Sequence, residues 1–161
     1  MSIPEIQVGV ISDTHGLLRP EAVAALRGSD LIIHAGDVGD PAILAELGRI
    51  APVHAIRGNI DVGEPLSKLP ETEVVEGGDT SIYLIHNLQE LDLNPCAAGF
   101  AAVVSGHSHK PASDVRDGIL YFNPGSAGLR RFTLPISVGK LRIHRGRIEP
   151  AIIELQLQSR P

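Results

Sequence analysis

IQVGVISDTHG, residues 6–16, joins a short apolar run to a cluster of polar side chains. The apolar run, residues 6–12, predicts a buried strand, and Asp13 and His15 follow it at once. Pro20 then opens a predicted helix, because proline is tolerated in the first helical turn. A buried strand, a polar loop and a helix are the first parts of a βαβ unit.

The same order of features recurs twice further along the chain. Residues 31–35 predict a second strand, which Asp37 follows, and Asp40 caps a second predicted helix. Residues 53–56 predict a third strand, which Asn59 follows. Two consecutive βαβ units indicate a parallel sheet with right-handed crossovers.

The remainder of the chain is predicted to be rich in strands. Residues 88–100 predict a short helical or irregular link. The predicted strands are residues 72–76, 80–85, 101–104, 112–116, 119–122, 133–140, 141–144 and 148–157. We therefore expect two sheets with helices outside, in a single domain over residues 1–161.

Composition narrows the class of protein. The chain has one cysteine, Cys96, so it forms no intrachain disulfide, which fits a reducing compartment. The N-terminal apolar run lacks a basic region before it and is too short to span a membrane, so we expect a cytoplasmic protein without a membrane partner. The net charge is -5 with scattered Lys and Arg, so nucleic acid is not the expected partner. Edge strands in the last third make a homodimer an open alternative.

Polar residues follow the predicted parallel strands at regular intervals. Asp37 lies 24 residues after Asp13, and Asn59 lies 22 residues after Asp37. One strand, one helix and two loops occupy about that length, so these residues are expected at the same carboxyl edge of the sheet. Open α/β sheets bind their ligands at that edge.

Later strands add imidazoles to this edge. His86 follows the second strand of the hairpin, and Gly106-His107-Ser108-His109 follows residues 101–104. Seven side chains are candidate metal ligands: Asp13, His15, Asp37, Asn59, His86, His107 and His109. They exceed the needs of one tetrahedral ion and fit two ions that share a carboxylate. An extended Gly-His-x-His segment would place both of its histidines on one side and Ser108 on the other.

The ordered set resembles the calcineurin-like metallophosphoesterase superfamily, whose pattern is Asp-x-His, Gly-Asp, Gly-Asn, His and Gly-His-x-His. The short chain and the later Asn123-Pro124-Gly125-Ser126 resemble its small bacterial and archaeal phosphodiesterase branch, which is related to the retromer subunit Vps29. The resemblance implies the metallo-dependent phosphatase fold, an α/β four-layer αββα sandwich of two mixed β-sheets flanked by helices.

The resemblance also implies a ligand assignment. One ion would be held by Asp13, His15, Asp37 and His109, and the other by Asp37, Asn59, His86 and His107, with Asp37 bridging. The implied function is a divalent-metal-dependent phosphoesterase, in the first place a phosphodiesterase, in which a water activated by two metal ions attacks a small-molecule phosphate ester. Mn²⁺ is the first choice, and iron, zinc, nickel and cobalt are alternatives.

Two departures from the family pattern bear on catalysis. The expected catalytic residues are Asp37 and Asn59. Ile60 stands where many larger members have a proton-donating histidine, and Asp61 is a candidate substitute for that donor. The alternative for Asp61 is a carboxylate that stabilises a turn. The second departure is that His86 is followed by Asn87, where many members of the family have Gly-His. The other functional class left open is a Vps29-like interaction scaffold with a vestigial metal site, although all seven ligand positions are filled.

Overall fold

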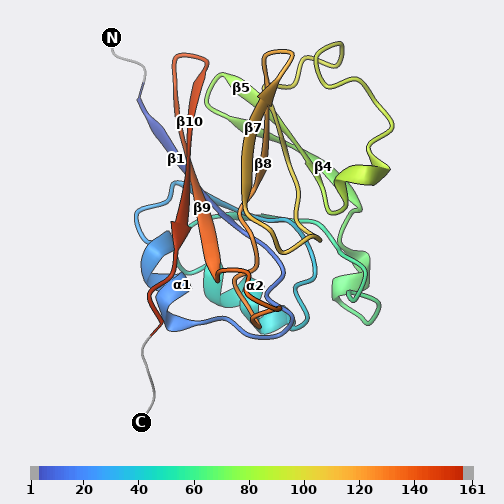
Figure 1. The fold of residues 1–161 in the computed structure, drawn as a ribbon, viewed down its shortest axis with the longest axis vertical. Helices are drawn as coiled ribbons and strands as arrows, with labels where there is room; N and C mark the ends of the chain where they lie inside the picture. Colours follow the sequence, from blue (N-terminus) through green and yellow to red (C-terminus); the bar gives the residue numbers. More distant parts are fainter. Residues whose placement is uncertain (1–3, 158–161) are drawn as a thin grey trace.

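The first sheet carries the predicted βαβ units at its centre. The structure, a computed structural model, describes residues 4–157, and residues 1–3 and 158–161 of the predicted domain lie outside the described residues. The strands of this sheet lie in the order β10-β9-β1-β2-β3 (Figure 1). Their bounds are β1 Ile6–Ile11, β2 Leu31–His34, β3 Val53–Ala55, β9 Ser137–His144 and β10 Arg147–Glu154. β1, β2 and β3 are parallel, as predicted, whereas β9 and β10 are antiparallel to their neighbours.

The second sheet is also mixed and has the order β4-β5-β6-β8-β7. Its strands are β4 Thr72–Gly77, β5 Thr80–Ile85, β6 Ala102–Val104, β7 Ala112–Arg116 and β8 Ile119–Asn123. β5, β6 and β8 are parallel, and antiparallel β4 and β7 form the edges. The prediction of two mixed sheets is therefore confirmed.

Alternation along the central strands explains how the layers stack. Val10 and Ile33 contribute to a core cluster that also contains Ile82, Leu84 and Phe122 of the second sheet. Their chain neighbours on the opposite face belong to a second cluster, which includes residues of both helices. One face of the first sheet thus packs on the second sheet and the other on helices, which is the pattern of a buried parallel sheet.

The helical layers are unequal. α1 Pro20–Leu26 and α2 Pro41–Leu47 pack on the first sheet, and Asp40 caps α2 by accepting a hydrogen bond from the Ala42 N–H at 2.9 Å. The short 3₁₀ segments are η1 Leu66–Lys68 and η2 Leu88–Glu90. The outer face of the second sheet is covered by residues of the 88–100 link, among them Leu88 and Phe100. Among the described residues, no helix is long and apolar enough to cross a membrane.

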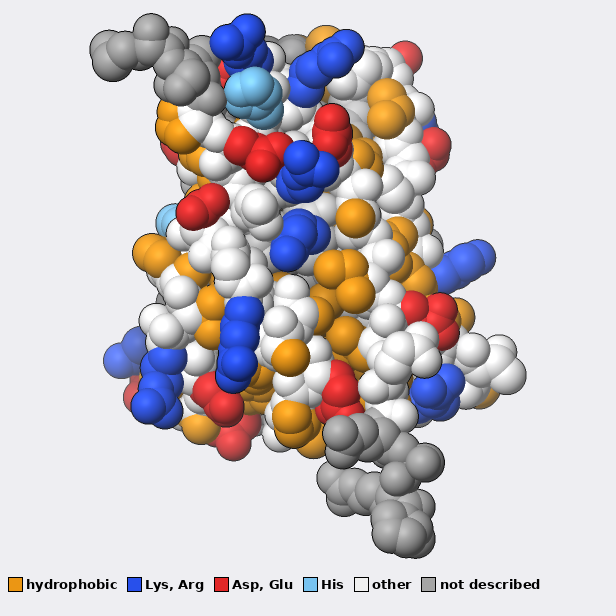
Figure 2. Space-filling model, turned by 90° about the vertical axis from the view of Figure 1, so that its left-hand side faces the viewer, with side chains coloured by type: hydrophobic (Ala, Val, Ile, Leu, Met, Phe, Trp, Pro, Cys, Tyr) orange, Lys and Arg blue, Asp and Glu red, His pale blue; other side chains and the backbone are white. Residues whose placement is uncertain are grey.

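One strand prediction was wrong in its division. Residues 133–140 and 141–144 were predicted as separate strands, but β9 is continuous from Ser137 to His144 and pairs with β10 along its whole length. Residues 133–136 precede the strand because Pro135 has no N–H for the ladder. On the face turned to the viewer in Figure 2, Lys and Arg side chains are interspersed with Asp and Glu, as the scattered sequence positions predicted.

Candidate metal centre

The loops that follow β1, β2 and β6 are bonded to one another at one edge of the molecule. The Asp13 N–H donates to Gly36 O at 3.0 Å, and the His15 N–H donates to Asp37 O at 2.9 Å. From the second sheet, the His107 N–H donates to Asp13 Oδ2 at 3.0 Å. Backbone pairing between loops therefore brings the predicted ligands of both sheets together.

Asp13 stands between two imidazoles. Its Oδ1 lies 3.4 Å from His109 Nε2 and 3.7 Å from His15 Nε2, and the two rings have centroids 5.1 Å apart. Its Oδ2 is already engaged, because the Ser12 hydroxyl donates to it at 2.7 Å. The carboxylate is thus held by one oxygen and directs the other towards His15 and His109, which form with it one group able to hold a metal ion.

The two oxygens of Asp37 also have different surroundings: one accepts a backbone hydrogen bond and the other faces imidazoles. The Ile60 N–H donates to Oδ1 at 3.1 Å, and Oδ2 lies 3.5 Å from His15 Nε2 and 3.4 Å from His86 Nε2. Asp37, His86 and Asp13 form a second group that is able to hold an ion. One oxygen of Asp37 therefore faces an imidazole from each group.

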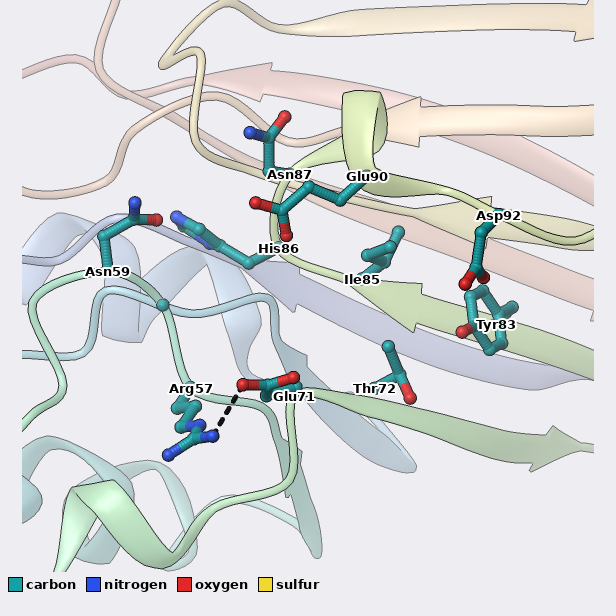
Figure 3. Close-up of a pocket in the computed structure, with 11 residues that line it drawn as sticks. Arg57, Asn59, Glu71, Thr72, Tyr83, Ile85, His86, Asn87, Glu90 and Asp92 are labelled. Atoms are coloured by element: carbon teal, nitrogen blue, oxygen red, sulfur yellow. Dashed lines mark hydrogen bonds and ion pairs between the residues drawn. The ribbon is translucent and has the colours of Figure 1, made fainter.

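The remaining two predicted ligands lie on the His86 side. The ring of His107 has its centroid 5.2 Å from that of His86 and is nearly perpendicular to it. Asn59 lines the same cavity as His86, and its amide lies near the imidazole in Figure 3. His107 and Asn59 are exposed, whereas His109 is buried.

The geometry expected for the Gly-His-x-His segment was wrong. His107 and His109 have φ values of 70° and 63°, so the segment is left-handed at both histidines and not extended. The two rings nevertheless lie at different imidazoles, His107 near His86 and His109 near His15. Ser108 Oγ accepts hydrogen bonds from the Lys110 N–H and Asn123 Nδ2, at 3.2 and 3.1 Å.

Unpartnered buried atoms point to the chemistry of the site. Within residues 4–157, the buried side-chain atoms without a hydrogen-bond partner are Asp13 Oδ1, His15 Nε2, His86 Nε2 and His109 Nδ1. All belong to predicted ligands, although buried polar groups are ordinarily hydrogen-bonded. Two ligand atoms each about 2.1 Å from one ion stand roughly 3–3.5 Å apart, close to the separations seen here. The donor set therefore fits divalent metal ions.

Backbone strain is concentrated at the same residues. Asp13, His15, Asp37, His107 and His109 all have φ between 48° and 70°, a region that residues other than glycine rarely adopt. Each such residue costs on the order of 1 kcal/mol, and strain of this kind clusters at functional sites.

Close backbone approach requires glycine beside the ligands. A Cβ on Gly36 would lie 2.5 Å from His86 Nδ1, and a Cβ on Gly58 would collide with the Asp37 carboxylate. Both glycines precede a predicted ligand, so a side chain at either position would displace the ligands themselves.

The imidazole of His86 is held in one orientation. Its Nδ1 donates to Ala35 O at 2.7 Å, which leaves the lone pair of Nε2 directed at Asp37. This arrangement, in which the second ring nitrogen is bonded to a carbonyl, is typical of metal-binding histidines.

Local charges set the protonation of the site. Burial raises the pKa of Asp37, but the His86 imidazole and the Ile60 N–H outweigh it and hold that pKa at about 2. The Asp13 carboxylate raises the pKa of His15, and Asp37 raises that of His86 against the effect of burial. Burial lowers the pKa of His109. Asp37 is therefore ionised throughout the physiological range, as a ligand must be.

Asp61 is fully engaged by the backbone. Its Oδ2 accepts from the Val38 and Gly58 N–H groups, at 3.1 and 2.9 Å, and its Oδ1 accepts from the Gly39 N–H at 3.0 Å. The side chain is 2 % exposed. These bonds favour the turn-stabilising alternative, and a catalytic role for Asp61 stays a prediction.

Sequence reasoning missed several residues that organise the site. His34 is fully buried: its Nδ1 accepts from the Gly36 N–H at 3.1 Å and its Nε2 donates to Thr14 Oγ1 at 3.0 Å. The Ser126 hydroxyl donates to Asp13 O at 3.1 Å. The positive charge of Arg131 acts to lower the pKa of His15 and of His109, although at His15 the Asp13 carboxylate outweighs it. The one sequence feature that singles out Arg131 is its position next to Arg130, and that feature does not place it at the metal centre.

Comparisons with known proteins agree with this geometry. Residues 6–146 match the family model of the calcineurin-like phosphoesterase superfamily domain. A probable metallophosphoesterase of Methanothermobacter thermautotrophicus is 38% identical over 157 residues, covering 91% of each chain. A probable metallophosphoesterase of Methanocaldococcus jannaschii is 36% identical, over 92% of this chain and 81% of that protein.

Solved structures share the fold. A structure described as a novel archaeal phosphodiesterase has a TM-score of 0.75 at 23% identity, covering 92% of this chain and 100% of that one. Vacuolar protein sorting 29 from Cryptosporidium parvum has a TM-score of 0.75 at 20% identity, covering 95% and 99%. Both likenesses establish the metallo-dependent phosphatase fold. The family match over residues 6–146 and the 38% identical relative show that the chain belongs to the calcineurin-like phosphoesterase superfamily.

Proposed function

We propose that this protein is a phosphodiesterase that works with two divalent metal ions. The observation that carries the proposal is the shared position of Asp37, whose Oδ2 faces His15 of one group and His86 of the other. The ligand assignment implied by the sequence is kept: Asp13, His15, Asp37 and His109 for one ion, and Asp37, Asn59, His86 and His107 for the other.

The residues of the chain have defined tasks in this reaction. The chemistry supplied by a bound pair of ions is neutralisation of phosphate charge and activation of water. The ions would be held by carboxylates of Asp13 and Asp37 and by neutral imidazoles, as metal binding requires. The left-handed backbone at these residues fixes the directions of the side chains. Water attacks phosphorus and loses a proton, and the bond from phosphorus to the leaving oxygen breaks. The departing alkoxide takes up a proton to become an alcohol unless it is stable as an anion.

The absence of a donor histidine defines the substrates that should react fastest. The Ile60 side chain has no acidic proton to donate, and both oxygens of Asp61 accept backbone hydrogen bonds. General acid help is worth roughly 10²–10⁴-fold. Esters with leaving groups that need no proton, such as nitrophenolate, should therefore be hydrolysed faster than alkyl esters.

The test is hydrolysis of bis-p-nitrophenyl phosphate with Mn²⁺, and then with iron, zinc, nickel or cobalt. Asp37→Asn should lower kcat at least about 10³-fold, in line with removal of a group that holds the catalytic charge. Elemental analysis should show close to two ions per wild-type chain. Asp40→Asn is the matched control, because asparagine caps α2 equally well and removes the same charge.

Absence of turnover with all of these metals, together with unchanged metal content in Asp37→Asn, would overturn the enzyme proposal. That outcome would favour the scaffold alternative, which the likeness of fold to Vps29 supports. The proposal has three further parts. The substrate is a small-molecule phosphate ester, the protein forms a homodimer through edge strands, and it is located in the cytoplasm.

A further inference from the structure

Two cavities meet at Asn87, the residue after the predicted ligand His86. One has a volume of about 430 Å³ and begins at His86 and Asn59. The other has a volume of about 340 Å³ and begins at His107. Asn87 lines both cavities, and its Oδ1 accepts a hydrogen bond from the Gln89 N–H at 3.1 Å, which holds it at the start of η2. The neighbouring imidazoles of His86 and His107 thus open into different cavities.

The first cavity carries an excess of negative charge. Arg57 and Glu71 line it and neutralise each other through an ion pair of 2.6 Å. Glu90 and Asp92 also line it, and within the described part of the chain no hydrogen bond or ion pair engages their carboxylates. Figure 3 shows the Glu90 carboxylate turned towards His86. Since His86 is a predicted metal ligand, the cavity opens directly from the metal centre, where the phosphate of a substrate would lie.

The second cavity has the opposite character. Tyr121 and Leu88 give it apolar surface, and the guanidinium of Arg116 lies 4.4 Å from the centre of the Tyr121 ring. Arg116 also pairs with Asp114 at 3.1 Å, and among residues 4–157 no carboxylate pairs with Lys110, which leaves a positive charge on the wall. A flat apolar group fits such a surface, because aromatic and guanidinium planes both stack on rings.

We propose that the substrate is an unsymmetrical phosphodiester whose two arms pass on either side of Asn87. The arm in the first cavity is an amino alcohol, whose positive charge faces Glu90 and Asp92. The arm in the second cavity is flat and apolar and lies beside Tyr121. This inference rests on the proposed phosphodiesterase function, and it excludes substrates with a further phosphate in the first arm, because like charges repel.

A pair of isosteric esters tests the assignment. p-Nitrophenyl phosphorylcholine and p-nitrophenyl 3,3-dimethylbutyl phosphate have the same leaving group and nearly the same shape, and only the choline ester carries a positive charge. We expect the wild type to prefer the choline ester about fivefold in kcat/KM, the size of two partly exposed charge interactions. The double variant Glu90→Gln, Asp92→Asn should reduce that preference to about one. Glu46→Gln on α2, outside both cavities, should leave it unchanged.

A second readout needs no turnover. Titration with choline should shift the backbone amide resonances of Gln89 and Glu90 in wild-type protein, and the uncharged isostere 3,3-dimethylbutanol should not. The double variant should lose the choline response.

The outcomes distinguish failure of the proposed phosphodiesterase function from failure of the substrate assignment. If neither ester is hydrolysed, the proposed function fails. If both are hydrolysed equally by the wild type and choline shifts no η2 resonance, the assignment of the first cavity is wrong while the phosphodiesterase proposal stands. If Lys110→Gln raises the choline preference and the double variant keeps it, the arms are reversed and the inference is overturned, because removal of a positive charge helps a cation bound beside it.

Discussion

His34 shows how one buried side chain ties two ligand loops together. The Gly36 N–H donates to its Nδ1, its Nε2–H donates to Thr14 Oγ1, and the Thr14 hydroxyl donates to Val38 O at 2.8 Å. This chain of bonds requires the neutral imidazole. Burial accordingly lowers the pKa of His34 to about 4.

We expect acid to weaken the metal-free protein through His34. Because its folded pKa lies below the unfolded value of 6.5, the unfolded chain binds the proton first. Stability is therefore complete above pH 6.5 and falls by about 3 kcal/mol as the pH drops towards 4. Urea unfolding across this range should show a flatter pH dependence in His34→Gln. The control is His144→Gln at an exposed site, and equal slopes in all three proteins would contradict the expectation.

Arg131 is the residue outside the predicted ligand set that should matter most for substrate binding. Its positive charge acts on the pKa of His15 and of His109, so we expect it to attract a phosphate bound beside them. Arg131→Gln should lower kcat/KM for bis-p-nitrophenyl phosphate about tenfold, in keeping with loss of one charge-assisted contact. The neighbouring variant Arg130→Gln removes the same charge and should have little effect. Equal losses in the two variants would indicate general charge attraction instead.

At the scale of elements, the site is a set of loops fastened to each other. Asp61 joins the loop after β2 to the loop after β3, since it binds Val38, Gly39 and Gly58 at once. The strands that lead into these loops could be predicted, because short apolar runs alternate with capped helices. The conformation of the loops could not be predicted. Their left-handed positions are occupied by Asp and His, and the sequence signal for a left-handed residue is glycine.

Asp61→Asn separates the two roles considered for this residue. An amide in place of the carboxylate loses an acceptor and sets a donor against a backbone N–H, so we expect a loss of about 2 kcal/mol in unfolding free energy. Nitrophenyl and alkyl esters should be affected in equal proportion. A selective loss of alkyl ester hydrolysis with unchanged stability would instead identify Asp61 as the proton donor.

At the scale of the whole molecule, the site depends on the contact between the two sheets. The first sheet supplies both aspartates, and the second supplies His86, His107 and His109. Parallel strand ends made this convergence predictable within the first sheet. The expected position of the second sheet's histidines at the same edge rested on their places after predicted strands and on the family resemblance, because spacing alone says nothing about how two sheets face each other. The 129–134 loop that carries Arg131 has no periodicity from which to place it.

Metal binding should therefore stabilise the entire chain. With Mn²⁺ at a hundred times its dissociation constant, the free energy of unfolding should rise by about 2.7 kcal/mol for each ion bound. The raised pKa values of His15 and His86 mean that protons compete with metal at higher pH than at an ordinary histidine, so the gain should fall as the pH drops through that range. Thermal unfolding with and without Mn²⁺ at several pH values measures it. Asp37→Asn should lose the gain, and a gain independent of pH would rule out imidazole ligands.

The left-handed backbone at five predicted ligands bears on how this chain can change over generations. Glycine would relieve the strain at each of those positions, yet it brings no donor atom. Drift towards greater stability would therefore erase the site one residue at a time unless selection for activity opposed it. A descendant released from that selection would be expected to accumulate glycine at these positions. It would have a higher free energy of unfolding and no catalytic activity.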